Sequence, residues 1–143
     1  MTTAFSSIVG AIVAKLQQAP AASQQVYRTR LRPLASQHSD AVVVRLVSSM
    51  PSMGAITGAP VDWITSIAVE CYARTTITTP DQAVDSLLAA AFAKVMSDTT
   101  LGGLCGDLFP AGVTADFDAD GEQTACITLH LEVQHRTSNL ILE

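Results

Sequence analysis

Hydrophobic residues recur along the chain at two spacings, and each spacing predicts one kind of element. From Phe5 to Leu16 they return every three or four positions, which places them on one side of an α-helix. Pro20 follows shortly afterwards, and the residue before a proline avoids the helical region. The first segment is therefore predicted to be an amphipathic helix that ends before Pro20.

The helical spacing returns over Pro80–Met96. Thr79 before the first helical proline, with Gln82 three positions further on, matches the pattern of an N-terminal capping box. One apolar stripe is expected to be buried, and its members are Val84, Leu87, Leu88, Ala91, Phe92 and Val95.

The remaining regular segments have the alternation or the β-branched content of strands. In the long segment Val61–Thr75, every second residue from Trp63 to Ala73 is expected on one face, and Ile127 to Val133 repeat this alternation near the C-terminus. The predicted strands are Val26–Arg32, Ala41–Val47, Val61–Thr75, Val113–Asp118 and Thr124–Thr137.

Two further segments lack such a pattern. Ser48–Pro60 contains two glycines and two prolines and carries no charge, so it is predicted to be a long irregular loop. Leu101–Gly106 is a glycine-rich connector. After the last strand, the tail Ser138–Glu143 carries the apolar triplet Leu140, Ile141 and Leu142.

Residues 1–143 thus form one predicted domain with the element order α-β-β-β-α-β-β. Helices with one apolar stripe and strands with one apolar face pack best as two layers. The expected fold is an α+β two-layer sandwich, with a mainly antiparallel sheet and both helices on one face.

Composition narrows the function classes. Charged residues make up 15% of the chain, against roughly 25% in ordinary soluble domains, and the formal charge is −5. An acidic balance argues against sequence-independent nucleic-acid binding, which depends on Lys and Arg. No apolar run approaches the roughly 20 residues that span a bilayer. Cys71, Cys105 and Cys126 are an odd number without paired spacing, as expected for free thiols.

The acidic run at Asp116, Asp118 and Asp120 resembles the start of a calcium-binding loop, but position twelve is Ile127 where a bidentate Glu is required. A hairpin turn at Ala119-Asp120-Gly121 is the preferred interpretation. Cys126, His130 and His135 could be metal ligands by type. A single strand cannot bring them around one ion, because Cys126 and His130 lie about 13 Å apart and His135 points to the opposite face. A site that uses a residue from elsewhere in the chain is the alternative.

Signatures of catalysis or of a phosphate site are also missing. No serine lies in a Gly-x-Ser-x-Gly turn, and Gly102-Gly103 is not followed by the Lys-Ser/Thr of a phosphate loop. No cofactor and no enzymatic activity are therefore expected.

Arginine and methionine instead suggest interfaces. Arg28, Arg30 and Arg32 share one face of a predicted strand, where they form either a solvated face or a contact with a partner. Met50, Met53 and Ile56 of the uncharged loop either fold back on the core or dock into another chain. Together with Leu140, Ile141 and Leu142 of the tail, these residues are the candidate interface.

The element order resembles that of the tail terminator proteins of phages with long, non-contractile tails, also known as minor tail or tail-completion proteins. The resemblance covers nearly the whole chain. It rests on the Trp63–Arg74 strand, the Pro80–Met96 helix, the Leu101–Leu104 connector and the strand pair that runs from Asp116 to Thr137.

The resemblance implies a structural virion protein that assembles in the host cytoplasm and lies at the head-proximal end of the tail. Its implied partners are further copies in a hexameric ring, the tail tube protein and the head-side connector or stopper protein. DNA would pass through the ring without sequence-specific binding. The alternatives are another neck or head-completion protein, and a small ligand-binding or enzymatic domain.

Overall fold

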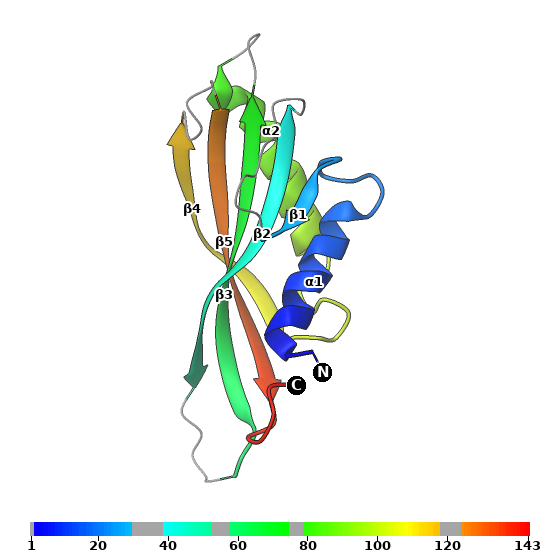
Figure 1. Ribbon diagram of the computed structural model, residues 1–143, viewed down its shortest axis with the longest axis vertical. Coiled ribbons are helices and arrows are strands. Elements are labelled where there is room, and N and C mark those ends of the chain that lie inside the picture. Colours follow the sequence, from blue (N-terminus) through cyan, green and yellow to red (C-terminus); the bar gives the residue numbers. More distant parts are fainter. Residues whose placement is uncertain (1, 30–38, 53–57, 75–78, 118–123) are drawn as a thin grey trace.

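The computed structural model describes residues 2–29, 39–52, 58–74, 79–117 and 124–143. Two helices and five strands follow one another in the predicted order (Figure 1). They are α1 (Ala4–Gln17), β1 (Val26–Arg28), β2 (Asp40–Ser52), β3 (Val61–Arg74), α2 (Pro80–Met96), β4 (Asp107–Phe117) and β5 (Thr124–Thr137).

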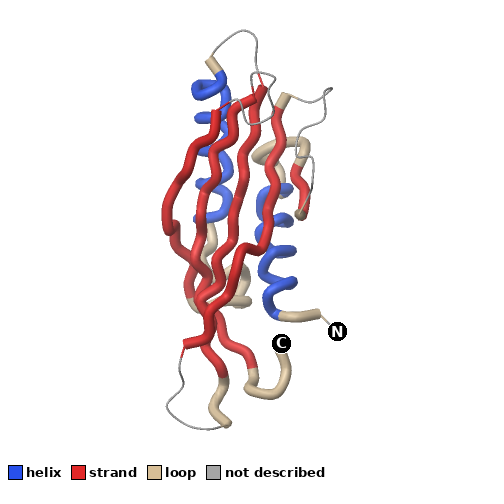
Figure 2. Tube along the Cα trace, turned by 60° about the vertical axis from the view of Figure 1, so that its left-hand side comes forward, coloured by secondary structure: helices blue, strands red, loops and turns tan. Residues whose placement is uncertain are grey.

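The strands form a single sheet in the order β1-β2-β3-β5-β4. β1 runs parallel to β2, and every other neighbouring pair is antiparallel. The two helices cover one face of this sheet, and the lower ends of β2, β3 and β5 project beyond them (Figures 1 and 2). The predicted α+β sandwich is confirmed.

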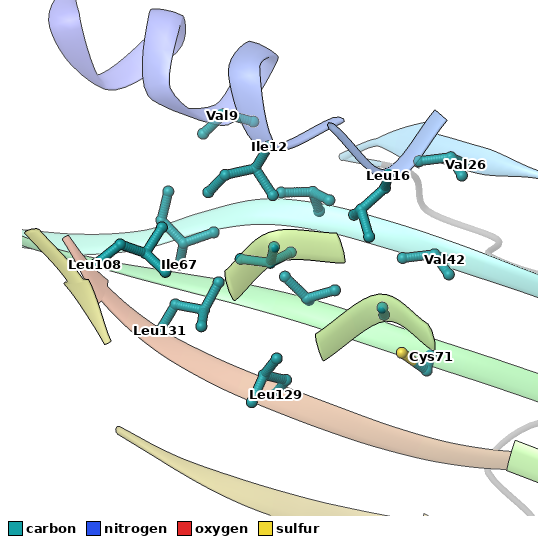
Figure 3. Packing of buried hydrophobic residues seen from close by; sticks show 14 of the residues in the cluster. Val9, Ile12, Leu16, Val26, Val42, Ile67, Cys71, Leu108, Leu129 and Leu131 are labelled. Atoms are coloured by element: carbon teal, nitrogen blue, oxygen red, sulfur yellow. The ribbon is translucent and has the colours of Figure 1, made fainter. Parts of the chain in front are cut away.

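The core lies between the helices and the sheet (Figure 3). Along β3, the inward face predicted from the alternation is buried from Thr65 to Ala73, and on β5 Leu129, Leu131 and Val133 are buried opposite it. The helices close the core with residues of two buried stripes, which are Ile8, Val9, Ile12 and Leu16 on α1 and Val84, Leu87, Ala91 and Val95 on α2.

The helix starts differ from the prediction in one respect. Thr3 caps α1, and its hydroxyl accepts a hydrogen bond from the Ser6 amide at 3.2 Å. At α2 the Thr79 side chain makes no cap hydrogen bond, so the predicted capping box is wrong. The Thr79 hydroxyl instead bonds to the Asp81 carboxylate and lowers its pKa.

β1 is shorter than predicted and β2 is longer. β1 ends at Arg28, and the next residue, Thr29, has a left-handed φ of +48° that is not strand geometry. β2 continues to Ser52, so the predicted loop is wrong for its first five residues. Pro51 is tolerated there because β1 pairs only with Val42–Val44, which leaves the rest of β2 as an edge strand in the described part of the sheet.

β4 begins at Asp107, six residues before the predicted start. It contains Pro110, and a register shift between Pro110 and Gly112 marks a bulge. A proline and a bulge are both compatible with β4 because it lies at the edge of the sheet.

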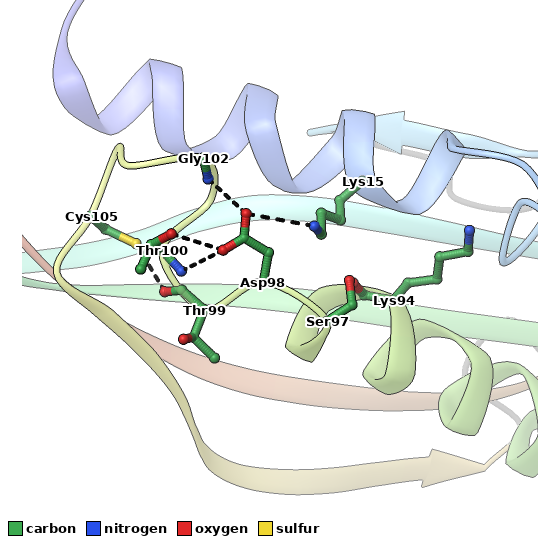
Figure 4. Close-up of polar contacts among 8 residues, drawn as sticks. All are labelled: Lys15, Lys94, Ser97, Asp98, Thr99, Thr100, Gly102 and Cys105. Atoms are coloured by element: carbon green, nitrogen blue, oxygen red, sulfur yellow. Dashed lines mark hydrogen bonds and ion pairs between the residues drawn. The ribbon is translucent and has the colours of Figure 1, made fainter.

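The glycine-rich connector is held by Asp98 (Figure 4). Its carboxylate accepts hydrogen bonds from the amide and hydroxyl of Thr100 and from the amide of Gly102, and it lies 3.9 Å from Lys15 Nζ on α1. These bonds lower the pKa of Asp98. Gly102 and Gly103 have φ values of +72° and +94°, which only glycine adopts readily.

Several predicted features lie outside the described residues. They are Arg30 and Arg32, Met53 and Ile56, and the hairpin turn at 119–121. Within the described residues, neither helix is long and apolar enough to cross a membrane.

Candidate interaction surfaces

Exposed apolar side chains gather at two edges and one end of the sheet. The first group lies along the free edge of β2, where Leu46 is 43% and Val47 is 48% exposed. Leu46 pairs with Ile67 and so faces the helix side, and Val47 lies at a bulge between paired neighbours. The sequence predicted both as central-strand residues, but the short β1 leaves their outer side without a paired strand in the described part of the sheet.

Arg28 lies next to this apolar edge. It pairs with Val44, two positions before Leu46, and is exposed. Its Nη2 donates to the carbonyl and hydroxyl oxygens of Ser6 on α1, at 3.1 and 2.5 Å. Both partners are uncharged, so these contacts fix the guanidinium without neutralising it. We call Arg28, Leu46 and Val47 the β1–β2 edge patch.

A groove of about 490 Å³ runs between α2 and the opposite edge strand, β4. Phe92, predicted to be buried, is 41% exposed here, and Val113 is 56% exposed. The prediction for Phe92 is wrong because α2 does not close over this part of β4, and Phe92 lines the open groove between them. The lining of this α2–β4 groove is Asp85, Leu88, Ala89, Phe92, Pro110, Ala111, Gly112, Val113 and Leu129.

The third group lies at the lower end of the sheet. Met50, a predicted interface residue, is 67% exposed on β2 and pairs with Ile64 on the face away from the helices. Nearby, Arg136 forms a two-pronged ion pair with Asp62, at 2.7 and 3.2 Å.

The C-terminal tail turns back beside this end. The Ser138 hydroxyl accepts hydrogen bonds from the amides of Leu140 and Ile141, at 3.1 and 3.0 Å. The Leu142 carbonyl accepts one from Ala4 at 2.6 Å. This turn leaves the predicted interface residue Leu140 86% exposed, with Ile141 and Leu142 each 45% exposed.

A buried polar cluster supports the lower end from the helix side. Thr65 Oγ1 lies 2.6 Å from His135 Nε2 and 2.7 Å from Ser49 Oγ. Phe5 of α1 packs edge-on against both His135 and Trp63. Burial lowers the pKa of His135, so the neutral ring is favoured.

The three cysteine thiols are buried in the structure. Cys71, Cys105 and Cys126 are free and buried, as predicted for unpaired thiols. Burial raises the pKa of Cys71 to about 12 and that of Cys105 to about 11, which disfavours the nucleophilic thiolate. Among the described residues, no three His, Cys, Asp or Glu side chains could hold a metal ion together.

The residues nominated from sequence therefore occupy separate places. Arg28 lies at the β1–β2 edge, Met50 and Leu140–Leu142 lie towards the lower end, and the other four are outside the described residues. Sequence analysis missed Leu46, Val47, Phe92 and Val113. The small neighbours of Val113, Gly112 and Ala111, are visible in the sequence, but its place in an edge strand is known only from the sheet order.

No family model and no curated protein matches this chain. Among solved structures, the chain is similar to one described as "Virion of native gene transfer agent (GTA) particle". The TM-score is 0.54 at 10% sequence identity, and the match covers 91% of this chain and 95% of that chain. At this identity the likeness establishes a shared fold that extends over nearly the whole of both chains.

Proposed function

We propose that this chain is a non-enzymatic structural protein of a phage-like virion, and that it forms a ring that caps the tail tube. The observation that carries the proposal is the fold shared over 91% of the chain with a component of a gene transfer agent virion. The order of elements that resembles tail terminators agrees with it.

The distribution of apolar surface supports an assembling subunit. Exposed apolar side chains gather at both edges and at the lower end of the sheet, where a monomer gains nothing by exposing them to water. The described residues also lack a metal cluster and an activated thiol, which favours a binding role over an enzymatic one.

In the proposed mechanism, the ring ends polymerisation by binding alone. One face of the ring docks on the last layer of tail tube protein, and the opposite face offers no acceptor for another layer. That second face then meets the head-side connector or stopper protein, and DNA passes through the ring. A cyclic arrangement requires heterologous contacts that close on themselves.

The nominated residues are proposed contacts. Met50 and the tail residues Leu140, Ile141 and Leu142 lie at one end of the molecule, where a ring face could form. Met53 and Ile56 follow Met50 in the chain, and Arg30 and Arg32 follow Arg28.

The test is to mix the purified chain with tail tubes that lack their terminal ring and to image them by electron microscopy. The expected result is a discrete ring, six subunits by mass, at one end of tubes of uniform length. The variant Met50→Asp should weaken this binding, whereas Thr114→Asp, on an exposed strand position away from the lower end, should not.

Binding to heads or connectors but not to tubes would overturn the capping role and favour another neck component. A chain that binds neither tubes nor heads would overturn the virion assignment itself.

A further inference from the structure

The two apolar edges of the sheet have opposite charge. We infer that the α2–β4 groove of one copy receives the β1–β2 edge patch of a second copy, and that this is the contact that joins neighbouring subunits. The inference rests on the proposed function for its biological setting, but it names the interface, and its first test needs no tail tubes.

The groove side is acidic. Asp85 lines the groove, and Asp81 is exposed one helical turn earlier on α2. The helix also carries Lys94, but its ammonium group points towards α1, where it donates to the Gln18 carbonyl at 2.6 Å. The charge presented beside Phe92 and Val113 is therefore negative.

The edge patch is basic. The Arg28 side chain lies against α1, where it donates hydrogen bonds to two uncharged oxygens of Ser6. It also passes close to Gly10, since a Cβ built on that residue would lie 3.4 Å from Arg28 Nη1. Asp40 begins β2 four residues before Val44, about 13 Å away along a strand, and it already accepts a bond from Ser23. Among the described residues Arg28 forms no ion pair, so it places a positive charge at the edge that carries Leu46 and Val47.

The groove is also apolar and open to a partner. The groove holds about 490 Å³ and its floor is Leu129 with the small residues Ala111 and Gly112 of β4. Leu46 and Val47 project from the only stretch of described strand that combines a free edge with two adjacent exposed branched side chains. Covering these half-exposed side chains would remove apolar surface from water, which favours association.

One copy cannot satisfy both surfaces. β2 and β4 are separated by β3 and β5, so three strand spacings of about 4.8 Å lie between the two edges. Arg28 and Leu46 of the edge patch lie on the helix side of the sheet, as does the groove at the opposite edge. A contact between them is therefore heterologous, and repeated contacts of this kind lead to a ring or an open filament.

The test uses one blocking variant for each surface. Leu46→Asp places a carboxylate in the edge patch, and Phe92→Asp places one in the groove. Each variant alone should fall back to monomer in sedimentation velocity, with self-association weakened at least tenfold. Leu104→Asp is the matched control, because Leu104 is 47% exposed and lies outside both surfaces. This variant should assemble as the parent chain does.

A mixture of the two variants gives the sharper result. The intact groove of Leu46→Asp chains can still receive the intact edge of Phe92→Asp chains, and both remaining surfaces are blocked. The mixture should therefore stop at a one-to-one heterodimer. Leu46→Gln and Phe92→Gln replace the Asp variants if circular dichroism shows that those fail to fold.

Assembly of both single variants like the parent, or a mixture without heterodimer, would overturn the inference. The inference would also be overturned if the parent chain stays monomeric in solution and both variants load onto tail tubes as well as the parent does. Heterodimers from a chain that never binds tails would overturn only the proposed function. If both variants form rings on tails as the parent chain does, only this interface is overturned.

Discussion

Thr65 and His135 form a buried hydrogen bond between β3 and β5, with 2.6 Å between Thr65 Oγ1 and His135 Nε2. His135 is 5% exposed, and among the described residues its Nδ1 has no hydrogen-bond partner. The ring packs edge-on against Phe5 of α1. The pair therefore joins the lower end of the sheet to the first turns of α1 through a ring whose burial lowers its pKa and favours the neutral form.

This relationship predicts acid sensitivity. Burial holds the pKa of His135 below its ordinary value of 6.5, so below pH 6.5 the unfolded chain binds a proton that the folded chain still resists. The contribution of the neutral ring is fully present above pH 6.5 and is lost as the pH falls through the lowered pKa. Urea unfolding at several pH values should show this slope, and His135→Gln should reduce it. His130→Gln, on the opposite face, is the control, and an unchanged slope in His135→Gln would contradict the prediction.

The core predicts a strong contrast between two leucines. Leu16→Ala removes a fully buried side chain of α1 and should lower the free energy of unfolding by about 2–5 kcal/mol. Leu140→Ala makes the same chemical change at an 86% exposed position and should leave that free energy nearly unchanged. Denaturant titration of both variants checks the contrast, and equal losses would show that α1 does not pack as described.

Asp98 is predicted to order the connector. Asp98→Asn removes the charge that accepts bonds from Thr100 and Gly102, so Tm should fall and these two amides should exchange hydrogen faster. Because the pKa of Asp98 lies below 3.8, its stabilising effect is present above pH 3.8 and is lost as the pH falls further. The difference in Tm between variant and parent should shrink over that range.

Asp116→Asn, on an exposed residue of β4, is the matched control for charge loss alone. Equal changes in Tm and in amide exchange for both Asn variants would contradict the role of Asp98.

Burial of the thiols predicts slow chemistry. At pH 8, Cys71 with a pKa of about 12 and Cys105 with a pKa of about 11 carry little thiolate, and all three cysteines are at most 7% exposed. Labelling with a maleimide should be slow in buffer and complete within minutes in denaturant, as followed by mass spectrometry. Fast labelling of Cys71 in buffer would contradict its place in the core.

Sequence patterns predicted the parts of the fold that depend on one long periodicity. The stripe of α1 and the alternation of β3 and β5 are set by their own residues, so Ile12 and Leu131 could be assigned to the core correctly. Strand ends and edges depend instead on neighbours. Pro51 argued for a loop, and only the shortness of β1 shows why a strand could hold it.

The candidate surfaces were harder to predict for the same reason. Phe92 has the spacing of a core residue, and Leu46 belongs to an apolar run typical of a central strand. Whether such residues are covered depends on which element packs over them, and local sequence does not specify that. Exposed tail residues such as Leu140 were easier, because Ser138–Glu143 has neither helical nor strand spacing.

Pro51 and Pro110 give both free edges of the sheet a common property. Each removes a backbone donor from a strand that no described strand covers on its outer side. Exposed edges usually invite further strands to add by backbone pairing, which leads to aggregates of unlimited length. With these donors missing, backbone pairing between the edges of separate subunits is disfavoured, so subunits made in excess are less prone to amyloid-like stacking. Recognition between copies then depends on side chains.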